Sequence, residues 1–156
     1  MKLSNIVSKP LIVASLLAVS FASAAVANPD KKNPVSGQDI AKIYSGKTWL
    51  WSKGGSYWAK DSSFQAVWED SVGLGKWYAT NKGDLCYEAT WYSGGSNEGK
   101  QIKRCWRHVT DSKGALWKQD PRDKKWYKAT TEVSERIKSG NKIKRDVRAA
   151  RKKNGV

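Results

Sequence analysis

The stretch DLCYEATWYSGGSNEGKQIKRCWRHVT, residues 84–110, predicts a β-hairpin around which the rest of the fold is organised. Two runs rich in aromatic and branched residues flank a turn segment of glycine, serine and asparagine. Cys86 and Cys105 lie symmetrically about the point between Gly95 and Ser96, inside that turn. A disulfide between facing cysteines and the position of the turn therefore agree on one register.

This register separates two faces of the hairpin. Side chains alternate between faces along a strand, so Leu85 and Trp106 face each other on an apolar side. Glu88 and Lys103 face each other on the opposite side, which also carries the cysteines. We therefore expect the disulfide on the outer face, where closing a loop of this length contributes roughly 3 kcal/mol.

The same pattern of aromatic runs and turns continues over residues 47–130. Turn clusters recur at regular spacing, which is typical of an antiparallel meander. Eight short strands are expected, at residues 47–52, 55–60, 63–69, 74–80, 84–92, 100–110, 114–119 and 124–130. So many strands in a short chain predict a mainly β fold. It is either a small antiparallel up-and-down barrel of lipocalin-like form or a curled meander, with a two-sheet sandwich as the alternative.

All nine tryptophans lie within this region, between Trp49 and Trp126. Four of them are expected in the core or in the barrel wall: Trp49, Trp68, Trp77 and Trp106. The other five are expected to be partly exposed: Trp51, Trp58, Trp91, Trp117 and Trp126.

The segment that precedes the strands predicts a short helix. Residues 28–35 carry two prolines and are expected to form a flexible leader. Ser36 is a candidate N-cap for a helix that presents Ile40, Ile43 and Tyr44 on one face.

The β domain, residues 36–130, is followed by a basic segment, residues 131–156. The first part of this segment fits either a last strand or a helical turn. Further on, Ile143, Val147 and Ala150 share a helical face among many Lys and Arg residues. This pattern predicts a basic, weakly amphipathic C-terminal helix with a frayed end.

Residues 1–27 have the three parts of a cleavable secretory signal: a start with two lysines, an apolar run, and small residues before the cleavage point. Cleavage is expected after Ala27, with Ala24 as the alternative. The apolar run is short for a bilayer span of about 20 residues. We therefore expect a periplasmic or secreted protein without a transmembrane segment after cleavage, and such a location favours a disulfide between the two cysteines.

Several short motifs occur in a fixed order along the β domain. They are Tyr44-Ser45-Gly46-Lys47-Thr48-Trp49-x-Trp51, Gly55-x-Tyr57-Trp58, Gly75-Lys76-Trp77, Leu85-Cys86-Tyr87-x-Ala89-x-Trp91 and Cys105-Trp106-Arg107-His108. The set resembles a group of small exported proteins, mostly from alphaproteobacteria, that are known only as a domain of unknown function, number 995. The resemblance covers about residues 36–130 and implies an exported β-rich domain with paired cysteines. It brings no known activity, and the basic segment after residue 140 is expected to be an addition of this chain.

The composition argues against catalysis. The chain has a single histidine, His108, and both thiols are expected to be oxidised, so that metal sites and nucleophile–base pairs lack their side chains. The acids Glu69, Asp70, Asp84 and Glu88 fall at turns or on the polar face, where solvated charge explains them better than paired catalytic carboxylates. We expect no metal, no cofactor and no enzymatic activity.

Binding is the class of function that remains. The aromatic and polar residues Tyr87, Trp91, Arg104 and His108 are expected to converge at one end of the interior as a small-molecule site. Removing the two signal lysines leaves a net charge of +13, against +15 for the whole chain. The candidates for contact with an anionic surface are Lys124, Lys125, Trp126, Lys128, Lys144, Arg145, Arg148, Arg151, Lys152 and Lys153.

Together these patterns predict an exported, non-enzymatic, envelope-associated protein. It is expected to bind an anionic or glycan ligand through basic and aromatic surface, and the alternative is a lipocalin-like carrier of a small molecule in the barrel interior. Behind a secretory signal, the expected partners are lipopolysaccharide, acidic polysaccharide or lipid head groups rather than nucleic acid.

Overall fold

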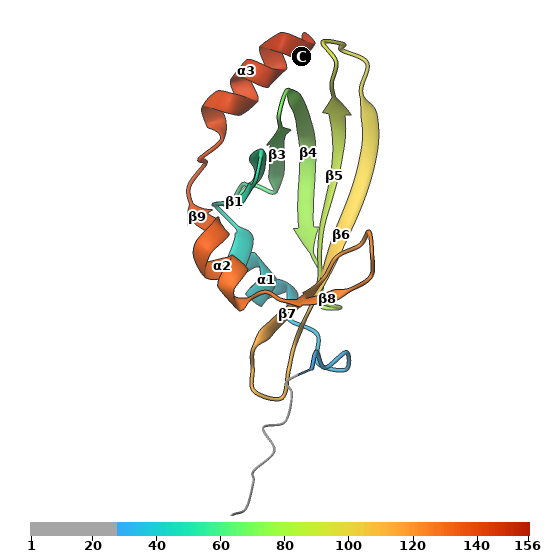
Figure 1. Cartoon of the computed structure of the whole chain (residues 1–156), viewed down its shortest axis with the longest axis vertical. Coiled ribbons are helices and arrows are strands. Elements are labelled where there is room, and N and C mark those ends of the chain that lie inside the picture. The colour runs from blue at the N-terminus through green and yellow to red at the C-terminus, as the bar shows by residue number, and fades with distance from the viewer. Residues whose placement is uncertain (1–27) are drawn as a thin grey trace, which may run out of the picture.

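The computed structural model describes residues 28–156, and the predicted signal sequence, residues 1–27, lies outside the described residues. In the described part, nine antiparallel strands form a curled half-barrel that is accompanied by three helices (Figure 1). The elements are α1 (Gly37–Tyr44), β1 (Lys47–Trp51), β2 (Gly54–Trp58), β3 (Ser63–Trp68), β4 (Ser71–Ala79), β5 (Asp84–Tyr92), β6 (Lys100–Thr110), β7 (Leu116–Gln119), β8 (Trp126–Lys128), α2 (Thr130–Arg136), β9 (Ile137–Ser139) and α3 (Lys144–Asn154). The mainly β fold with a helix near each end is confirmed.

The strands follow one another through the sheet in chain order, as a meander does. Strands β1 to β7 each pair with the next strand in the chain, and β9 pairs with the remaining edge of β1. The central β5–β6 hairpin has the predicted register, with Leu85 opposite Trp106 and Cys86 opposite Cys105. The two cysteines form the disulfide. No pairing joins β8 to β9 within residues 28–156, so the sheet curls without closing into a barrel.

The chain beyond residue 130 is part of the same structural unit. The segment that fitted either a strand or a helical turn forms both, because α2 ends at Arg136 and β9 begins at Ile137. Strand β9 then adds to the edge of β1, with Ile137 opposite Trp49. The basic segment after residue 130 therefore contributes a strand to the sheet.

The segment expected to be a flexible leader is held against β6. The backbone N–H of Asp30 donates to the carbonyl of Thr110 at 3.1 Å, and that of Val35 donates to the carbonyl of His108 at 3.1 Å. Pro34 forms an isolated bridge with Val109 between these two bonds. Most of the segment therefore extends the sheet locally instead of moving freely.

Helix α1 covers one end of the concave face. The Ser36 side chain accepts a hydrogen bond from the backbone N–H of Asp39, which confirms the predicted N-cap. Ile40 and Tyr44 on the buried side of the helix join the main core cluster. This end of the half-barrel is therefore filled by side chains.

Trp58 occupies the centre of that core, contrary to the prediction that it would be partly exposed. It is fully buried, and its ring centroid lies 5.0 Å from that of Phe64 and 5.7 Å from that of Tyr44. Trp68 was predicted to be in the core or wall and is instead 40% exposed. Both tryptophans face the concave side, but Trp58 lies at the end that α1 covers and Trp68 lies at the open end.

Helix α3 packs on a second apolar cluster, on the opposite face of the sheet. Val147 and Ala150 of the helix lie against Val67 of β3 and Val72 of β4. The helix runs beside the tip of the β5–β6 hairpin (Figure 1). Its last turn is not frayed as predicted, because Asn154 is buried and donates to the carbonyl of Asp70 at 2.8 Å.

Candidate functional site

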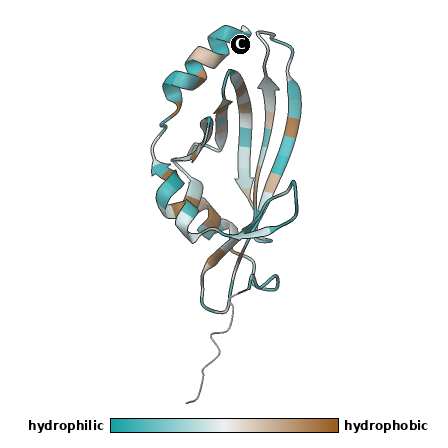
Figure 2. Ribbon diagram, viewed as in Figure 1, coloured by the Kyte–Doolittle hydropathy of each residue, from teal (hydrophilic) through white to brown (hydrophobic). Residues whose placement is uncertain are grey.

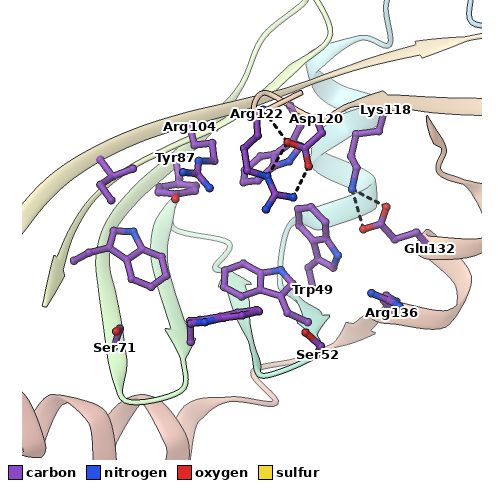
Figure 3. A pocket seen from close by; sticks show the side chains of 15 residues that line it. Trp49, Ser52, Ser71, Tyr87, Arg104, Lys118, Asp120, Arg122, Glu132 and Arg136 are labelled. Atoms are coloured by element: carbon purple, nitrogen blue, oxygen red, sulfur yellow. Dashed lines mark hydrogen bonds and ion pairs between the residues drawn. The ribbon is translucent and has the colours of Figure 1, made fainter. Parts of the chain in front are cut away.

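The open end of the concave face holds a cavity of about 670 Å³. The residues around it come from β1, β3, β4, β5, β6, β7, α2 and the β7–β8 loop, so that distant parts of the chain meet there (Figure 3). They are Trp49, Trp51, Ser52, Trp68, Ser71, Tyr87, Trp91, Ile102, Arg104, Trp106, Lys118, Asp120, Arg122, Glu132 and Arg136. Six of them are aromatic and six are charged, and four of the charged residues come from α2 and the β7–β8 loop.

The aromatic side chains form a connected wall. The ring centroid of Trp49 lies 5.3 Å from that of Trp106 and 6.3 Å from that of Trp51, and the Trp51 centroid lies 6.1 Å from that of Trp68. These are ordinary edge-to-face and tilted aromatic contacts. The exposure of Trp68 leaves one end of this wall open to solvent.

Trp91 extends the wall onto β5, and glycine makes room for it. A Cβ atom at Gly73 of β4 would lie 2.6 Å from the Trp91 ring, closer than any side chain tolerates. The indole N–H of Trp91 is buried and has no hydrogen-bond partner in residues 28–156. Trp91 therefore contributes its ring to the cavity wall, while its N–H is enclosed by the surrounding side chains.

The side chain of Lys118, on β7, reaches the cavity next to the ring of Trp49. Its ammonium lies 2.6 Å and 2.8 Å from the two carboxylate oxygens of Glu132 on α2 and 3.9 Å from the centroid of the Trp49 ring. Burial lowers the pKa of Lys118, while the neighbouring Glu132 carboxylate opposes that effect. This ion pair joins α2 to the sheet and fixes one side of the cavity.

A second ion pair comes from the loop between β7 and β8. The guanidinium of Arg122 donates to the two carboxylate oxygens of Asp120 at 3.0 Å and 2.7 Å, as drawn in Figure 3. These hydrogen bonds lower the pKa of Asp120 to about 2. The carboxylate is therefore ionised at any physiological pH and is already engaged.

Arg104 of β6 and Arg136 of α2 complete the charged lining. Neither forms an ion pair or a side-chain hydrogen bond with another residue in the 28–156 range, whereas both acids of the lining are paired. Two guanidinium groups, each with several N–H donors, are therefore available at an aromatic cavity. An arginine in this state is suited to a carboxylate, sulfate or phosphate group.

The structure brings together three of the four residues expected at an interior site. Tyr87, Trp91 and Arg104 line the cavity, and burial raises the pKa of Tyr87. His108 does not belong to the lining, because it lies two positions further along the inner face, under α1. Its interior orientation was predicted correctly, and its membership of the site was not.

His108 is fully buried and bonded at both ring nitrogens. Its Nδ1 lies 3.1 Å from the carbonyl oxygen of Trp106, and its Nε2 lies 3.0 Å from the hydroxyl of Tyr44. Because a carbonyl only accepts, Nδ1 carries the proton, and Nε2 accepts from the Tyr44 hydroxyl. Burial first, and then the charge of Lys118, lower the pKa of His108 to about 4, so the ring is neutral.

The candidates for an anionic surface fall in two separate places. One group, Lys124, Lys125, Trp126 and Lys128, lies in and next to the loop before β8, and the other, Lys144, Arg145, Arg148, Arg151, Lys152 and Lys153, lies on α3. Figure 1 shows β8 and the loop before it well separated from α3. They therefore do not form one continuous basic surface.

Three cations of the lining, Lys118, Arg122 and Arg136, were not predicted as site residues. Only Lys118 had a usable signal, because strand alternation places it inward if the neighbouring Trp117 points outward. Arg122 lies on a loop and Arg136 on a helix, and both reach the cavity only because the sheet curls. No local pattern predicts such an approach.

The four acids that the sequence places at turns or on the polar face are surface residues in ion pairs. Glu69 pairs with Lys53, Asp70 with Lys153, Glu88 with Lys103, and Asp84 with Arg107. In the described part of the chain, no group of three His, Cys, Asp or Glu side chains is arranged to hold a metal ion. None of the helices formed by residues 28–156 has the length and apolar character needed to cross a bilayer.

Comparison with known proteins places the chain in a family. No curated protein and no solved structure matches it. The sequence model of the family described as "Protein of unknown function (DUF995)" matches residues 13–148. The match is longer than the expected 36–130 and takes in the beginning of α3, so the basic segment up to residue 148 is not an addition of this chain. The protein belongs to this family, DUF995.

Proposed function

We propose that this protein is an exported, non-enzymatic binding protein whose concave face takes a small organic anion with a ring-shaped body. The observation that carries the proposal is the cavity of about 670 Å³, in which six aromatic side chains surround two arginines without ion pairs. Its volume is within the range of about 300–1,000 Å³ that is usual for small-molecule sites. In this proposal, aromatic and basic side chains act together inside the curl of the sheet instead of on its outer surface.

The charges of the lining favour an anionic ligand. Arg104, Lys118, Arg122 and Arg136 outnumber the two acids, and each acid already has a cationic partner. Binding an anion therefore does not require breaking an existing ion pair. A charge-assisted hydrogen bond to an arginine contributes about 1.5–3 kcal/mol, enough to select an anion over a neutral molecule of the same shape.

The aromatic wall favours a ligand with a flat or ring-shaped apolar part. Trp49, Trp51, Trp68 and Trp91 present ring surface to the cavity, and a ligand face that stacks on them removes apolar area from water. An acidic sugar or an aromatic acid has both the ring and the negative group. The ligand class is therefore defined by its chemistry, not by one compound.

The same side chains support binding over catalysis. The single histidine is neutral and enclosed by Tyr44 and Trp106, away from the cavity. Asp120 is held ionised by Arg122, so it is a poor proton donor. His108 is therefore out of reach of a bound ligand, and Asp120 has too low a pKa to act as a general acid or base near neutral pH.

Export is the second part of the proposal. The pattern of residues 1–27 is that of a secretory signal, and the Cys86–Cys105 disulfide is compatible with a periplasmic or secreted protein. Mass spectrometry of the protein recovered from the periplasm or the medium should give a chain that starts at Asn28, or at Ala25 if cleavage follows Ala24. Recovery of the full-length chain from the cytoplasm alone would contradict export.

Two fluorescent probes of matched shape test the ligand class. 8-Anilinonaphthalene-1-sulfonate carries a sulfonate, and N-phenyl-1-naphthylamine has the same rings without it. We expect Arg104→Met to weaken binding of the sulfonate probe about tenfold or more and to change binding of the neutral probe little. Arg145→Met, which removes the same charge from α3, serves as the matched control and should leave both affinities unchanged.

The two variants also show how the proposal would fail. If Arg104→Met and Arg145→Met weaken binding of the sulfonate probe equally, binding depends on the net charge of the protein and not on the cavity. If Arg104→Met leaves sulfonate binding intact, Arg104 does not contact the anion. Either result would overturn the proposed site.

A further inference from the structure

Helix α3 is anchored so that one side always faces solvent. Val147 and Ala150 are buried against Val67 and Val72, on the face of the sheet opposite to the cavity. At the C-terminal end, Asn154 accepts a hydrogen bond from the backbone N–H of Gly95 at 3.0 Å and donates to the carbonyl of Asp70 at 2.8 Å. The orientation of the helix is therefore fixed at both its middle and its end.

The exposed side of α3 is almost entirely cationic, and Figure 2 shows the helix as one of the most hydrophilic elements. Its exposed basic residues are Lys144, Arg145, Arg148, Arg151, Lys152 and Lys153. The helix carries one acid, Asp146. Of these six cations, only Lys153 forms an ion pair with another residue in the range 28–156, and its partner is Asp70. Five cations on one short helix thus lack an acidic partner.

Part of this side borders a groove of about 390 Å³ between α3 and β3. The groove is lined by four of the cations, Lys144, Arg148, Arg151 and Lys152, together with Gln65, Val147 and Val156, and by no Asp or Glu side chain. One of the cations, Arg151, donates to the carbonyl oxygen of Val156 at 3.2 Å. Four exposed positive side chains gathered on one concave surface raise the local positive potential and attract anions from solution. The groove is therefore a second candidate site, independent of the cavity on the concave face.

We propose that α3 and this groove dock on an anionic phospholipid surface and bind its phosphate head groups. An eleven-residue helix is about 16 Å long, so its row of cations extends well beyond one phosphate and matches an array of them. Each Lys or Arg held near an anionic membrane contributes about 1 kcal/mol, so that several together give stable, salt-dependent attachment. The cavity on the other face stays open to its ligand in this arrangement.

The test is co-sedimentation of the purified protein with vesicles. Vesicles of phosphatidylglycerol should retain the protein at low salt and release it at high salt, and vesicles of phosphatidylcholine should not retain it. Changing the four groove cations to Gln should weaken attachment by roughly 1,000-fold, because four contributions of about 1 kcal/mol are lost. The matched control replaces four exposed lysines outside both groups of anionic-surface candidates with Gln and should weaken it less than about threefold: Lys31, Lys32, Lys82 and Lys113.

A charge-conserving variant distinguishes loss of positive charge from misfolding as the cause of weaker attachment. Exchanging Lys for Arg and Arg for Lys at the same four groove positions should restore attachment, and the fluorescent sulfonate probe should bind the cavity in every variant. Equal losses in the groove variant and the control would overturn the inference, because net charge alone would then explain attachment. Retention on phosphatidylcholine, or tighter binding of duplex DNA through the same four residues, would overturn it as well.

Discussion

Lowering the pH from about 7.5 to about 5 should destabilise the fold through His108, the one histidine of the chain. In the folded protein, burial and the charge of Lys118 lower the pKa of His108 to about 4. In the unfolded chain the same ring takes up a proton near its ordinary pKa of 6.5. Acid therefore stabilises the unfolded state first. The stability that depends on the neutral ring is complete above about pH 6.5 and is lost as the pH falls toward 4.

The size of the effect follows from the difference between the two pKa values. Each unit corresponds to about 1.4 kcal/mol, so the full loss is about 3 kcal/mol, of which about 2 kcal/mol appears by pH 5. Carboxylates contribute mainly below that pH, since their ordinary pKa values lie near 4. The window from pH 7.5 to 5 therefore isolates the histidine.

Urea unfolding followed by tryptophan fluorescence measures this loss at each pH. His108→Gln keeps groups that can bond to Tyr44 and to the Trp106 carbonyl but does not titrate, so its stability should be flat over the same window. A change of less than 0.5 kcal/mol in the unaltered protein would refute the reasoning, as would an NMR titration that places the ring pKa near 6.5.

Two further predictions concern stability. Replacing Cys86 and Cys105 with Ser should lower the free energy of unfolding by about 3 kcal/mol, because the disulfide closes a loop with a sequence separation of 19; a loss below 1 kcal/mol in urea unfolding would contradict this. Glu132→Gln should cost about 2 kcal/mol, because it leaves the buried ammonium of Lys118 without its partner, and adding Lys118→Met should restore most of that loss. A double variant no more stable than Glu132→Gln alone would show that the pair does not act as a unit.

The central hairpin could be predicted in detail because several independent signals coincide there. The spacing of Cys86 and Cys105, the glycine-rich turn and the alternation of apolar residues all require the same register, which β5 and β6 adopt. The N-cap at Ser36 and the buried side of α3 could also be predicted, because each follows from a local sequence pattern. Such features depend on residues close in sequence and on the periodic spacing of apolar residues. Both can be recognised in the sequence without a structure.

Features set by the curl of the sheet could not be predicted. Trp58 and Trp68 both face the concave side, and only the position of α1 decides which of them is buried. The position of Arg136 could not be predicted either. It belongs to α2, which connects β8 to β9, and its side chain lines the cavity only because the sheet curls. His108 was misplaced for a related reason, since alternation gives the face of a strand but not the distance along it.

The measurement that tests the central claim most directly is an NMR titration of the tryptophan indole N–H signals with 8-anilinonaphthalene-1-sulfonate. Each tryptophan gives one such signal, so the cavity and the rest of the domain report separately. Five tryptophans line the cavity: Trp49, Trp51, Trp68, Trp91 and Trp106. We expect their signals to shift together as the probe saturates one site, with much smaller shifts for the other four. Shifts concentrated at Trp117 and Trp126, or no saturable shift at the cavity tryptophans, would contradict binding at the concave face.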